Sequence, residues 1–234
     1  MERVAFILPA LNEEAAIEST LAGLLAAPPR DAVRGQIIVV DNGSTDATAG
    51  RARACGATVI AEPRRGYGRA CLAGLAALDQ GTTIVVFLDA DGSDDPADLP
   101  QLLQPLARDE ADLVLGSRVL GERERGALTP QQRFGNWLAT TLIRILYGVR
   151  YTDLGPFRAI RRSALARLNM RDTDFGWTVE MQINAARQGL RVREIPVRYR
   201  RRRHGKSKIS GTLRGTLAAG CKILWTIARY ARAR

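Results

Sequence analysis

Short apolar segments alternate with longer amphipathic segments over the first half of the chain. Five apolar runs have the length of buried strands, at 4–8, 36–41, 57–61, 84–89 and 112–116. Between them, apolar residues recur at helical spacing in 12–25, 68–79 and 96–107, and a turn at 42–46 leads into a helix cap. Strands that alternate with helices predict an α/β fold, with a mostly parallel sheet and helices on both faces.

The second half of the chain follows a different pattern. It contains three amphipathic helical segments, at 131–149, 179–188 and 211–231. Two strand-like runs lie among them, at 155–160 and 192–199. No internal repeat, low-complexity tract or linker interrupts the sequence. We therefore predict one domain at 1–210 and a basic amphipathic C-terminal helix at 211–234 that belongs to the same unit.

The positive charge of the chain is concentrated near its C-terminus. The 234 residues carry 35 basic and 24 acidic side chains, a net charge of +11. Residues 191–234 hold 14 basic residues and one acidic residue, which gives this segment +13 and leaves 21 − 23 = −2 for the rest. A basic block of this kind predicts an anionic partner such as phosphate, a membrane surface or nucleic acid.

Composition excludes several classes of protein. The apolar fraction of 46% and charged fraction of 25% are those of an ordinary globular protein, and disorder is not expected. No uncharged apolar run is long enough to cross a membrane. The three cysteines are scattered and no signal peptide precedes the first strand, so we expect a cytoplasmic location.

Polar side chains follow three of the predicted strands, where ligands of open parallel sheets bind. Glu13 follows the first strand, Asp41 ends the second, and Asp89 and Asp91 end the fourth. Asp89 and Asp91 flank a single residue, so both can point the same way and hold a hard divalent cation between two phosphates. A solvated acidic turn or a helix cap produces the same short pattern.

Two other interpretations of these motifs fit less well. Residues 87–93 are similar to the first motif of haloacid-dehalogenase-type phosphatases, which also need a downstream lysine and acidic pair. Here the only lysines stand at 206, 208 and 222, and no acidic residue follows Glu194. Gly66 and Gly68 supply two of the three glycines of a dinucleotide-binding fingerprint, but they follow the third strand and not the first.

The whole ordered set of motifs resembles family 2 glycosyltransferases of the GT-A fold, close to the dolichol-phosphate mannose and glucose synthases. The segments that carry this resemblance are 9–13, 40–46, 65–70, 89–91, 116–118, 133–136, 153–158 and 202–208. Each segment alone is a weak signal, but their order along nearly the whole chain is specific.

The resemblance implies a nucleotide-sugar donor and inversion at the anomeric carbon. The residues that would bind the donor are Pro9, Leu11, Glu13, Asp41, Asn42, Gly66, Asp89 and Asp91. Asp89 and Asp91 would hold Mg²⁺ or Mn²⁺ on the diphosphate, with Ser93 where relatives place Gln or His as a further metal contact. Arg202 and Lys208 would close over the same diphosphate.

The acceptor determines whether the reaction needs a general base. A lipid phosphate is already ionised and needs cations to position it, whereas a sugar hydroxyl must lose a proton. Ser117, Arg118 and Arg133 match positions that hold the acceptor phosphate in the resembled family, although both arginines also suit an ordinary surface. Asp153 and Glu180 remain candidate bases, and Glu180 equally suits the first turn of a helix.

A polyprenyl phosphate acceptor requires access to a membrane. The segments at 131–149 and 211–231 combine apolar and basic residues as interfacial helices do, although helices that pack on a core look similar. With the adjacent positive charge, we expect peripheral attachment to the cytoplasmic membrane face. Two alternatives stay open: a soluble hydroxyl-bearing acceptor, and nucleic-acid binding by the arginine run at 200–203, for which no recognition motif is present.

Overall fold

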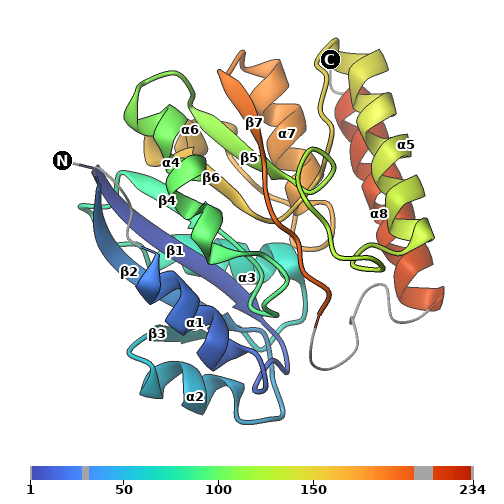
Figure 1. The fold of residues 1–234 in the computed structure, drawn as a ribbon. Helices are drawn as coiled ribbons and strands as arrows, with labels where there is room; N and C mark the ends of the chain where they lie inside the picture. The colour runs from blue at the N-terminus through green and yellow to red at the C-terminus, as the bar shows by residue number, and fades with distance from the viewer. Residues whose placement is uncertain (1, 28–31, 203–212, 233–234) are drawn as a thin grey trace.

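A seven-stranded sheet forms the centre of the computed structural model, which describes residues 2–27, 32–202 and 213–232. The strand order is β3-β2-β1-β4-β6-β5-β7 (Figure 1). The strands are β1 (Glu2–Ala10), β2 (Ala32–Asp41), β3 (Thr58–Ala61), β4 (Ile84–Phe87), β5 (Leu113–Ser117), β6 (Arg158–Arg161) and β7 (Val192–Pro196). All seven lie where the sequence predicts a strand, with shifts of a few residues at the ends.

One strand runs against the others. β6 pairs antiparallel with both β4 and β5, whereas the remaining pairs in the sheet are parallel. The chain leaves β5 through a long helical excursion and returns as β6 in the opposite direction, between β4 and β5. The predicted mostly parallel α/β sheet is therefore confirmed.

Two hydrophobic cores fill the two faces of the sheet, because side chains of a strand alternate between faces. On β1, Val4, Phe6 and Leu8 belong to one core, and Ile7 belongs to the other. The first core contains residues of α1 (Ile17–Ala26), α2 (Thr48–Ala54) and α4 (Leu99–Ala107). The second contains residues of α3 (Tyr67–Ala76), α6 (Arg162–Leu168) and α7 (Trp177–Arg187). Helices on both faces are confirmed, although the short α6 was not predicted.

Two long helices lie side by side at one end of the molecule, α5 (Pro130–Tyr147) and α8 (Leu213–Arg232) (Figure 1). Both contact α7 as well as each other. α5 begins at a capping box in which Thr129 and Gln132 bind each other's backbone N–H groups, and it ends at Gly148 with φ 71°. This pair of helices extends the molecule beyond the sheet, next to the carboxyl end of β5.

The first helix differs from the predicted one. The sequence predicts a helix that opens near Asn12, whereas α1 begins only at Ile17. Asn12 has φ 53°, a left-handed conformation that a helix does not contain. Residues 12–16 form a turn that keeps Glu13 at the end of β1, and this places Glu13 at the functional site.

Candidate active site

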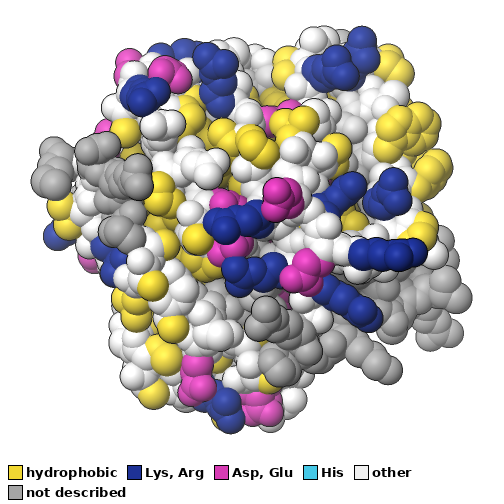
Figure 2. All heavy atoms as spheres, viewed as in Figure 1, with side chains coloured by type: hydrophobic (Ala, Val, Ile, Leu, Met, Phe, Trp, Pro, Cys, Tyr) yellow, Lys and Arg dark blue, Asp and Glu magenta, His cyan; other side chains and the backbone are white. Residues whose placement is uncertain are grey.

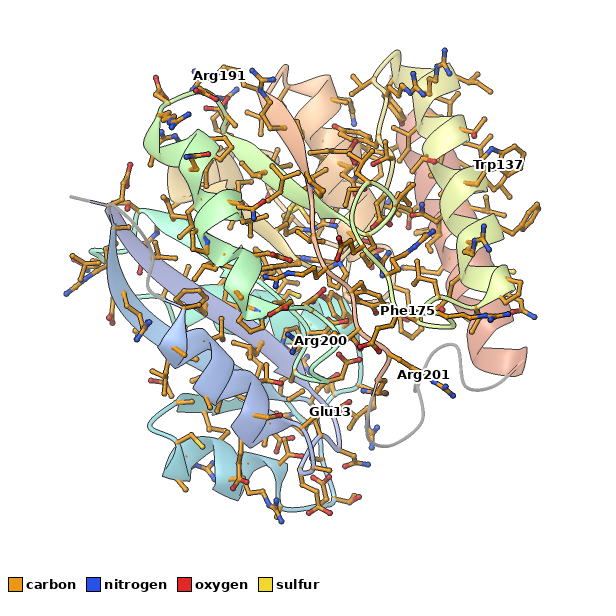
Figure 3. The ribbon with its side chains drawn as sticks, in the orientation of Figure 1. Glu13, Trp137, Phe175, Arg191, Arg200 and Arg201 are labelled. Atoms are coloured by element: carbon orange, nitrogen blue, oxygen red, sulfur yellow. The ribbon has the colours of Figure 1, made fainter. Side chains whose placement is uncertain are left out.

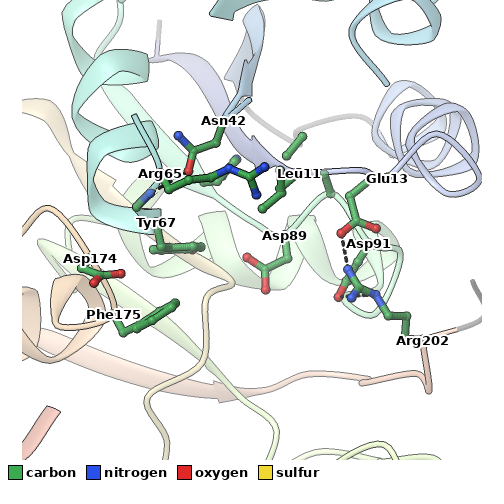
Figure 4. Close-up of a pocket in the computed structure, with 14 residues that line it drawn as sticks. Leu11, Glu13, Asn42, Arg65, Tyr67, Asp89, Asp91, Asp174, Phe175 and Arg202 are labelled. Atoms are coloured by element: carbon green, nitrogen blue, oxygen red, sulfur yellow. Dashed lines mark hydrogen bonds and ion pairs between the residues drawn. The ribbon is translucent and has the colours of Figure 1, made fainter. Parts of the chain in front are cut away.

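A pocket of about 470 Å³ opens at the carboxyl ends of β1, β2 and β4 (Figure 4). Its walls come from the ends of three strands, from the start of α3 and from two segments far along the chain. They comprise Pro9, Ala10, Leu11, Glu13, Asn42, Arg65, Gly66, Tyr67, Asp89, Ala90, Asp91, Asp174, Phe175 and Arg202. Most of the residues predicted to bind the donor are therefore brought together here.

Of the two polar residues at the end of β2, Asn42 lines this pocket and Asp41 does not. Asn42 is buried and donates hydrogen bonds to the carbonyls of Glu62 and Arg64, at 2.9 and 2.8 Å. Its Oδ1 accepts a hydrogen bond from the Gly66 N–H at 2.9 Å. Asn42 thus fixes the segment at 62–66, whereas Asp41 does not line the pocket and accepts a hydrogen bond from the Ser44 N–H.

The turn at Gly66 and Gly68 requires glycine for steric reasons. Gly66 has φ +146°, which side-chain-bearing residues rarely adopt, and a Cβ there would overlap the carbonyl oxygen of Thr173. A Cβ on Gly68 would overlap the carbonyl oxygen of Asp172. The start of α3 therefore lies directly against the segment at 172–174, which leads to the pocket residues Asp174 and Phe175.

Three carboxyl groups crowd together beyond β4. Burial raises the pKa of Asp89 well above its ordinary range, and the charges of Asp91 and Asp94 raise it further. Burial, followed by the charge of Asp91, raises the pKa of Asp94 to about 7. Asp94 accepts a hydrogen bond from the Asp89 N–H through Oδ2 at 3.2 Å, while its buried Oδ1 has no hydrogen-bond partner among the described residues. This site therefore favours a positive charge.

Arg202 supplies one positive charge at the edge of the pocket. Its Nη2 forms an ion pair with Glu13, and its Nε lies 3.4 Å from Asp91 Oδ2 (Figure 4). Residue 202 thus lies 189 positions from Glu13 in sequence and beside it in space. The other predicted diphosphate contact, Lys208, lies outside the described residues.

A second cavity, of about 290 Å³, adjoins the first. Both are lined by Tyr67, Asp89, Asp91 and Phe175. The second continues past Arg118 and Tyr199 into the space between α5 and α8. Its further lining residues are Leu128, Gln131, Gln132, Gly135, Asn136, Leu154, Pro156, Thr178, Ala219, Gly220 and Ile223. The carboxylates of β4 therefore stand where two compartments meet.

Comparison with protein families matches residues 5–168 to the model of glycosyl transferase family 2. The chain belongs to this family. The match includes the ends of β1, β2 and β4 and the turn before α3, which form most of the first pocket. The protein is thus a glycosyltransferase, and the seven-stranded sheet with its flanking helices is the GT-A fold.

Individual relatives agree with this assignment. The glycosyltransferase is 40% identical to an uncharacterized glycosyltransferase of Mycobacterium tuberculosis, over 93% of this chain and 94% of that protein. It is 32% identical to an undecaprenyl-phosphate mannosyltransferase of Micrococcus luteus, over 91% and 90% of the two chains. Among solved structures, glucosyl-3-phosphoglycerate synthase of M. tuberculosis with Mn²⁺, UDP and glucosyl-3-phosphoglycerate matches with a TM-score of 0.76 and 27% identity, covering 97% of this chain and 79% of that one.

The donor set of the glycosyltransferase fits a divalent cation. Asp89 and Asp91 provide the hard oxygen ligands that Mg²⁺ and Mn²⁺ prefer, and their mutual repulsion would be relieved by the cation. No group of three potential metal-binding side chains is found in the part of the chain that the structure describes. The two carboxylates of Asp89 and Asp91 are sufficient, because such ions usually keep waters and substrate phosphates as their other ligands. Ser93 is buried outside the pocket lining and donates its backbone N–H to Asp91 at 2.9 Å.

The three predicted acceptor residues of the glycosyltransferase lie in three different places. Arg118 lines the second cavity, next to Asp89 and Asp91. Ser117 is fully buried, shares a hydrogen bond with Thr152 Oγ1 at 2.7 Å and accepts the backbone N–H groups that follow it, so it shapes the loop after β5. Arg133 lines a separate pocket on the other side of α5.

The two candidate bases are both buried and engaged elsewhere. Asp153 accepts three hydrogen bonds from Arg118, two from the guanidinium and one from the backbone N–H, each 2.8 Å long. Glu180 accepts the backbone N–H groups of Arg171 and Asp172 and the hydroxyl of Tyr230. Neither lines the two cavities, so their geometry favours positioning roles.

Several residues in or next to the first pocket were not found from the sequence. Asp94 belongs to the acidic stretch 89–95, and its proximity to Asp91 was a signal that could have been used. Arg65 and Tyr67 belong to the quoted motif at 65–70, which gave them no role. Asp174 and Phe175 carry no motif, because the fold alone brings the segment at 172–175 against the start of α3.

Proposed function

We propose that this glycosyltransferase moves a hexose from a nucleotide sugar, of the GDP-mannose or UDP-glucose type, to a polyprenyl phosphate at a membrane surface. The transfer inverts the anomeric carbon and depends on Mg²⁺ or Mn²⁺. The relative from M. luteus, named as an undecaprenyl-phosphate mannosyltransferase, supports this acceptor. The Mn²⁺ and UDP in the related synthase structure support the donor and the metal.

The observation that carries the proposal is the continuity of the two cavities at Asp89 and Asp91. The first cavity offers the nucleotide sugar polar side chains at the strand ends, among them Glu13, Asp89 and Asp91. The second leads from the same carboxylates past Arg118 to a lining that includes the apolar side chains of Leu128, Leu154 and Ile223, next to the two long helices. An acceptor with a phosphate at one end and a hydrocarbon chain at the other matches this order, from charged side chains to apolar ones.

The chemistry agrees with a phosphate acceptor. A phosphate is ionised at neutral pH, so no general base is needed, and Asp153 and Glu180 are free to serve as buried anchors. Arg118 presents a planar guanidinium, which binds phosphate oxygens in pairs. A divalent cation bound by Asp89 and Asp91 would supply charge neutralisation for the departing nucleoside diphosphate.

The long helices provide a surface suited to a lipid substrate. On α5, Phe134, Trp137 and Ile145 expose 62, 59 and 72% of their surfaces, and on α8 Trp225 exposes 51%. Aromatic and apolar side chains beside basic ones are typical of helices that lie in the membrane interface. None of the described helices is long and apolar enough to span a membrane. We therefore propose peripheral attachment through α5 and α8.

A soluble phosphate acceptor is the second candidate. The related synthase structure contains glucosyl-3-phosphoglycerate, a product with a small soluble phosphate-bearing part. Arg118 would suit such an acceptor as well, but the apolar walls between α5 and α8 would then have no role.

The deciding experiment measures transfer of labelled sugar from GDP-mannose and UDP-glucose in the presence of Mn²⁺. Each donor is offered polyprenyl phosphate in detergent, 3-phosphoglycerate, or no acceptor. We expect an organic-extractable labelled product only with polyprenyl phosphate. Label transferred to 3-phosphoglycerate but not to lipid would overturn the lipid acceptor and leave the glycosyltransferase activity intact.

Asp91→Ala serves as the inactive variant and Glu18→Gln as its control. Loss of Asp91 removes one ligand for the cation, and we expect transfer to fall on the order of a hundredfold or more. Glu18, on α1, forms an exposed ion pair with Arg51 of α2 at 3.7 Å, so its replacement should leave transfer unchanged. Equal activity in Asp91→Ala and the wild type would contradict the assigned metal site.

A further inference from the structure

A third pocket, of about 370 Å³, lies along α5 outside the two cavities already described. Four arginines line it: Arg123, Arg133, Arg144 and Arg150. No acidic residue lines it; the others are Val119, Leu128, Asn136, Trp137, Thr140, Thr141, Tyr151 and Thr152. The pocket shares only Leu128 and Asn136 with the cavity between α5 and α8, and none with the donor pocket.

The four arginines have no acidic partner among the residues that the structure describes. Within residues 2–27, 32–202 and 213–232, none of them has an ion pair with an acidic side chain. Other arginines of the same protein are paired, for example Arg118 with Asp153 and Arg198 with Asp98. Like charges gathered around one cavity repel each other, and a bound anion relieves that repulsion.

The pocket lies next to exposed aromatic side chains. Arg133, Trp137 and Arg144 follow one another at intervals of four and seven residues, so they share one face of α5. Trp137 points away from the body of the molecule (Figure 3), and its ring lies 5.8 Å from that of Phe134. Figure 2 shows basic side chains beside hydrophobic ones over this end of the molecule.

The neighbouring helix α8 repeats this combination. The ring of Trp225 has the Lys222 amine at 4.8 Å and the Arg229 guanidinium at 5.3 Å from its centre. Tryptophan at the level of lipid headgroups, with arginine or lysine beside it, is a recurring feature of proteins at membrane interfaces. Because α5 and α8 lie side by side, both can meet the same bilayer (Figure 1).

We propose that the four-arginine pocket binds the phosphate group of an anionic phospholipid in the bilayer on which α5 and α8 lie. This inference rests on the membrane attachment in the proposed function, and it adds a lipid site distinct from that of the acceptor. The acceptor phosphate must reach Asp89 and Asp91, which are absent from this pocket. The pocket phospholipid would instead hold α5 against the membrane and keep the acceptor cavity at its surface.

The test compares binding to vesicles of phosphatidylglycerol with phosphatidylcholine and to vesicles of phosphatidylcholine alone, by flotation. In Arg144→Gln/Arg150→Gln two charges of the pocket are lost, while Arg133 is retained. Each basic residue near an anionic surface contributes about 1 kcal/mol, so we expect roughly thirtyfold weaker binding to the anionic vesicles. The control Arg53→Gln/Arg108→Gln loses the same charge from α2 and from the end of α4, and should bind as the wild type does.

A charge-conserving variant distinguishes binding in a defined pocket from general attraction to a positively charged surface. Arg144→Lys/Arg150→Lys keeps the charge but loses the planar guanidinium forks, so we expect binding to phosphatidylglycerol vesicles to weaken several-fold. Binding equal to the wild type in this variant, or an equal loss in the control pair, would overturn the pocket.

A soluble ligand is tested with inorganic phosphate. If millimolar phosphate bound the wild type but not Arg144→Gln/Arg150→Gln, and both bound vesicles equally, the pocket would belong to a soluble phosphate and the lipid assignment would fail. Failure of the proposed function is detected separately, as absence of transfer by the wild-type protein to polyprenyl phosphate in detergent. Circular dichroism melting of each variant confirms that it folds.

Discussion

Asp153 holds the guanidinium of Arg118 in a two-point ion pair, with Nε to Oδ2 and Nη2 to Oδ1 both at 2.8 Å. The Asp153 side chain is 1% exposed and that of Arg118 is 13% exposed. Arg118 also lies over the ring of Tyr199, 5.1 Å from its centre. The arginine is therefore fixed on two sides, and its remaining surface faces the second cavity.

Asp153→Asn should destabilise the protein strongly. The variant leaves a buried guanidinium without its counter-charge, and breaking a buried ion pair in this way costs about 3–5 kcal/mol. The free energy of unfolding, measured in urea at neutral pH, should fall by that amount. If Asp153 were chiefly a general base, stability would change little and transfer alone would be lost.

The pH dependence of this cost follows from the pKa of Asp153. Burial opposes ionisation, but the Arg118 charge and hydrogen bonds hold the pKa of Asp153 below its ordinary 3.8. The stabilisation is therefore complete above the unfolded pKa and is lost as pH falls through the lower folded pKa. The difference in unfolding free energy between the wild type and Asp153→Asn should be constant near neutrality and shrink only in strong acid. A difference that grew on acidification would contradict this ion pair.

Glu180→Gln should act through the loop at 171–175 and not through proton transfer. The carboxylate accepts the Asp172 N–H at 2.7 Å and the Arg171 N–H at 3.1 Å, and an amide offers only one oxygen for them. We expect a loss of about 1–3 kcal/mol in stability, and a raised KM for the donor because this loop continues to Asp174 and Phe175. The pH profile of kcat should keep its shape.

Tyr230→Phe is the matched variant, because it removes a hydrogen bond to the same carboxylate from α8. It should also lower the stability and raise the KM for the donor, but by less, with a loss of about 1 kcal/mol in stability. Transfer abolished by Glu180→Gln but untouched by Tyr230→Phe, together with loss of one limb of the pH profile, would instead establish Glu180 as a base.

Gly68→Ala should distort the first pocket, although replacing a glycine in a helix by alanine usually stabilises the helix. Its Cβ would overlap the carbonyl oxygen of Asp172, so the segment at 172–175 must move. We expect about 1–3 kcal/mol of destabilisation and a higher donor KM. Gly50→Ala in α2 is the control, since nothing lies within 4 Å of its Cβ and the change should gain about 0.5–1 kcal/mol. Thermal melting of both variants with and without UDP tests the contrast.

The sequence predicted the sheet well because strand and helix patterns are local properties. The alternation of apolar runs in the first half placed β1 to β5 and the helices between them. The missed helix α6 has seven residues, too few for a periodic pattern to emerge. The opening of α1 was placed five residues early, because the left-handed Asn12 is fixed by contacts that include Ser44, 32 residues away.

In the site, too, the features that depend on local sequence were predicted, and the contacts between distant residues were not. The sequence was enough to place Asp89 and Asp91 at the end of a buried strand, near Glu13 and Asn42, because the carboxyl ends of parallel strands meet at one edge of the sheet. Three features of the site depend on the tertiary structure. Arg202 contacts Glu13, Asp153 forms an ion pair with Arg118, and Arg133 lines a pocket outside the second cavity. Pairings between residues far apart depend on how helices and loops pack, and no spacing along the chain encodes them.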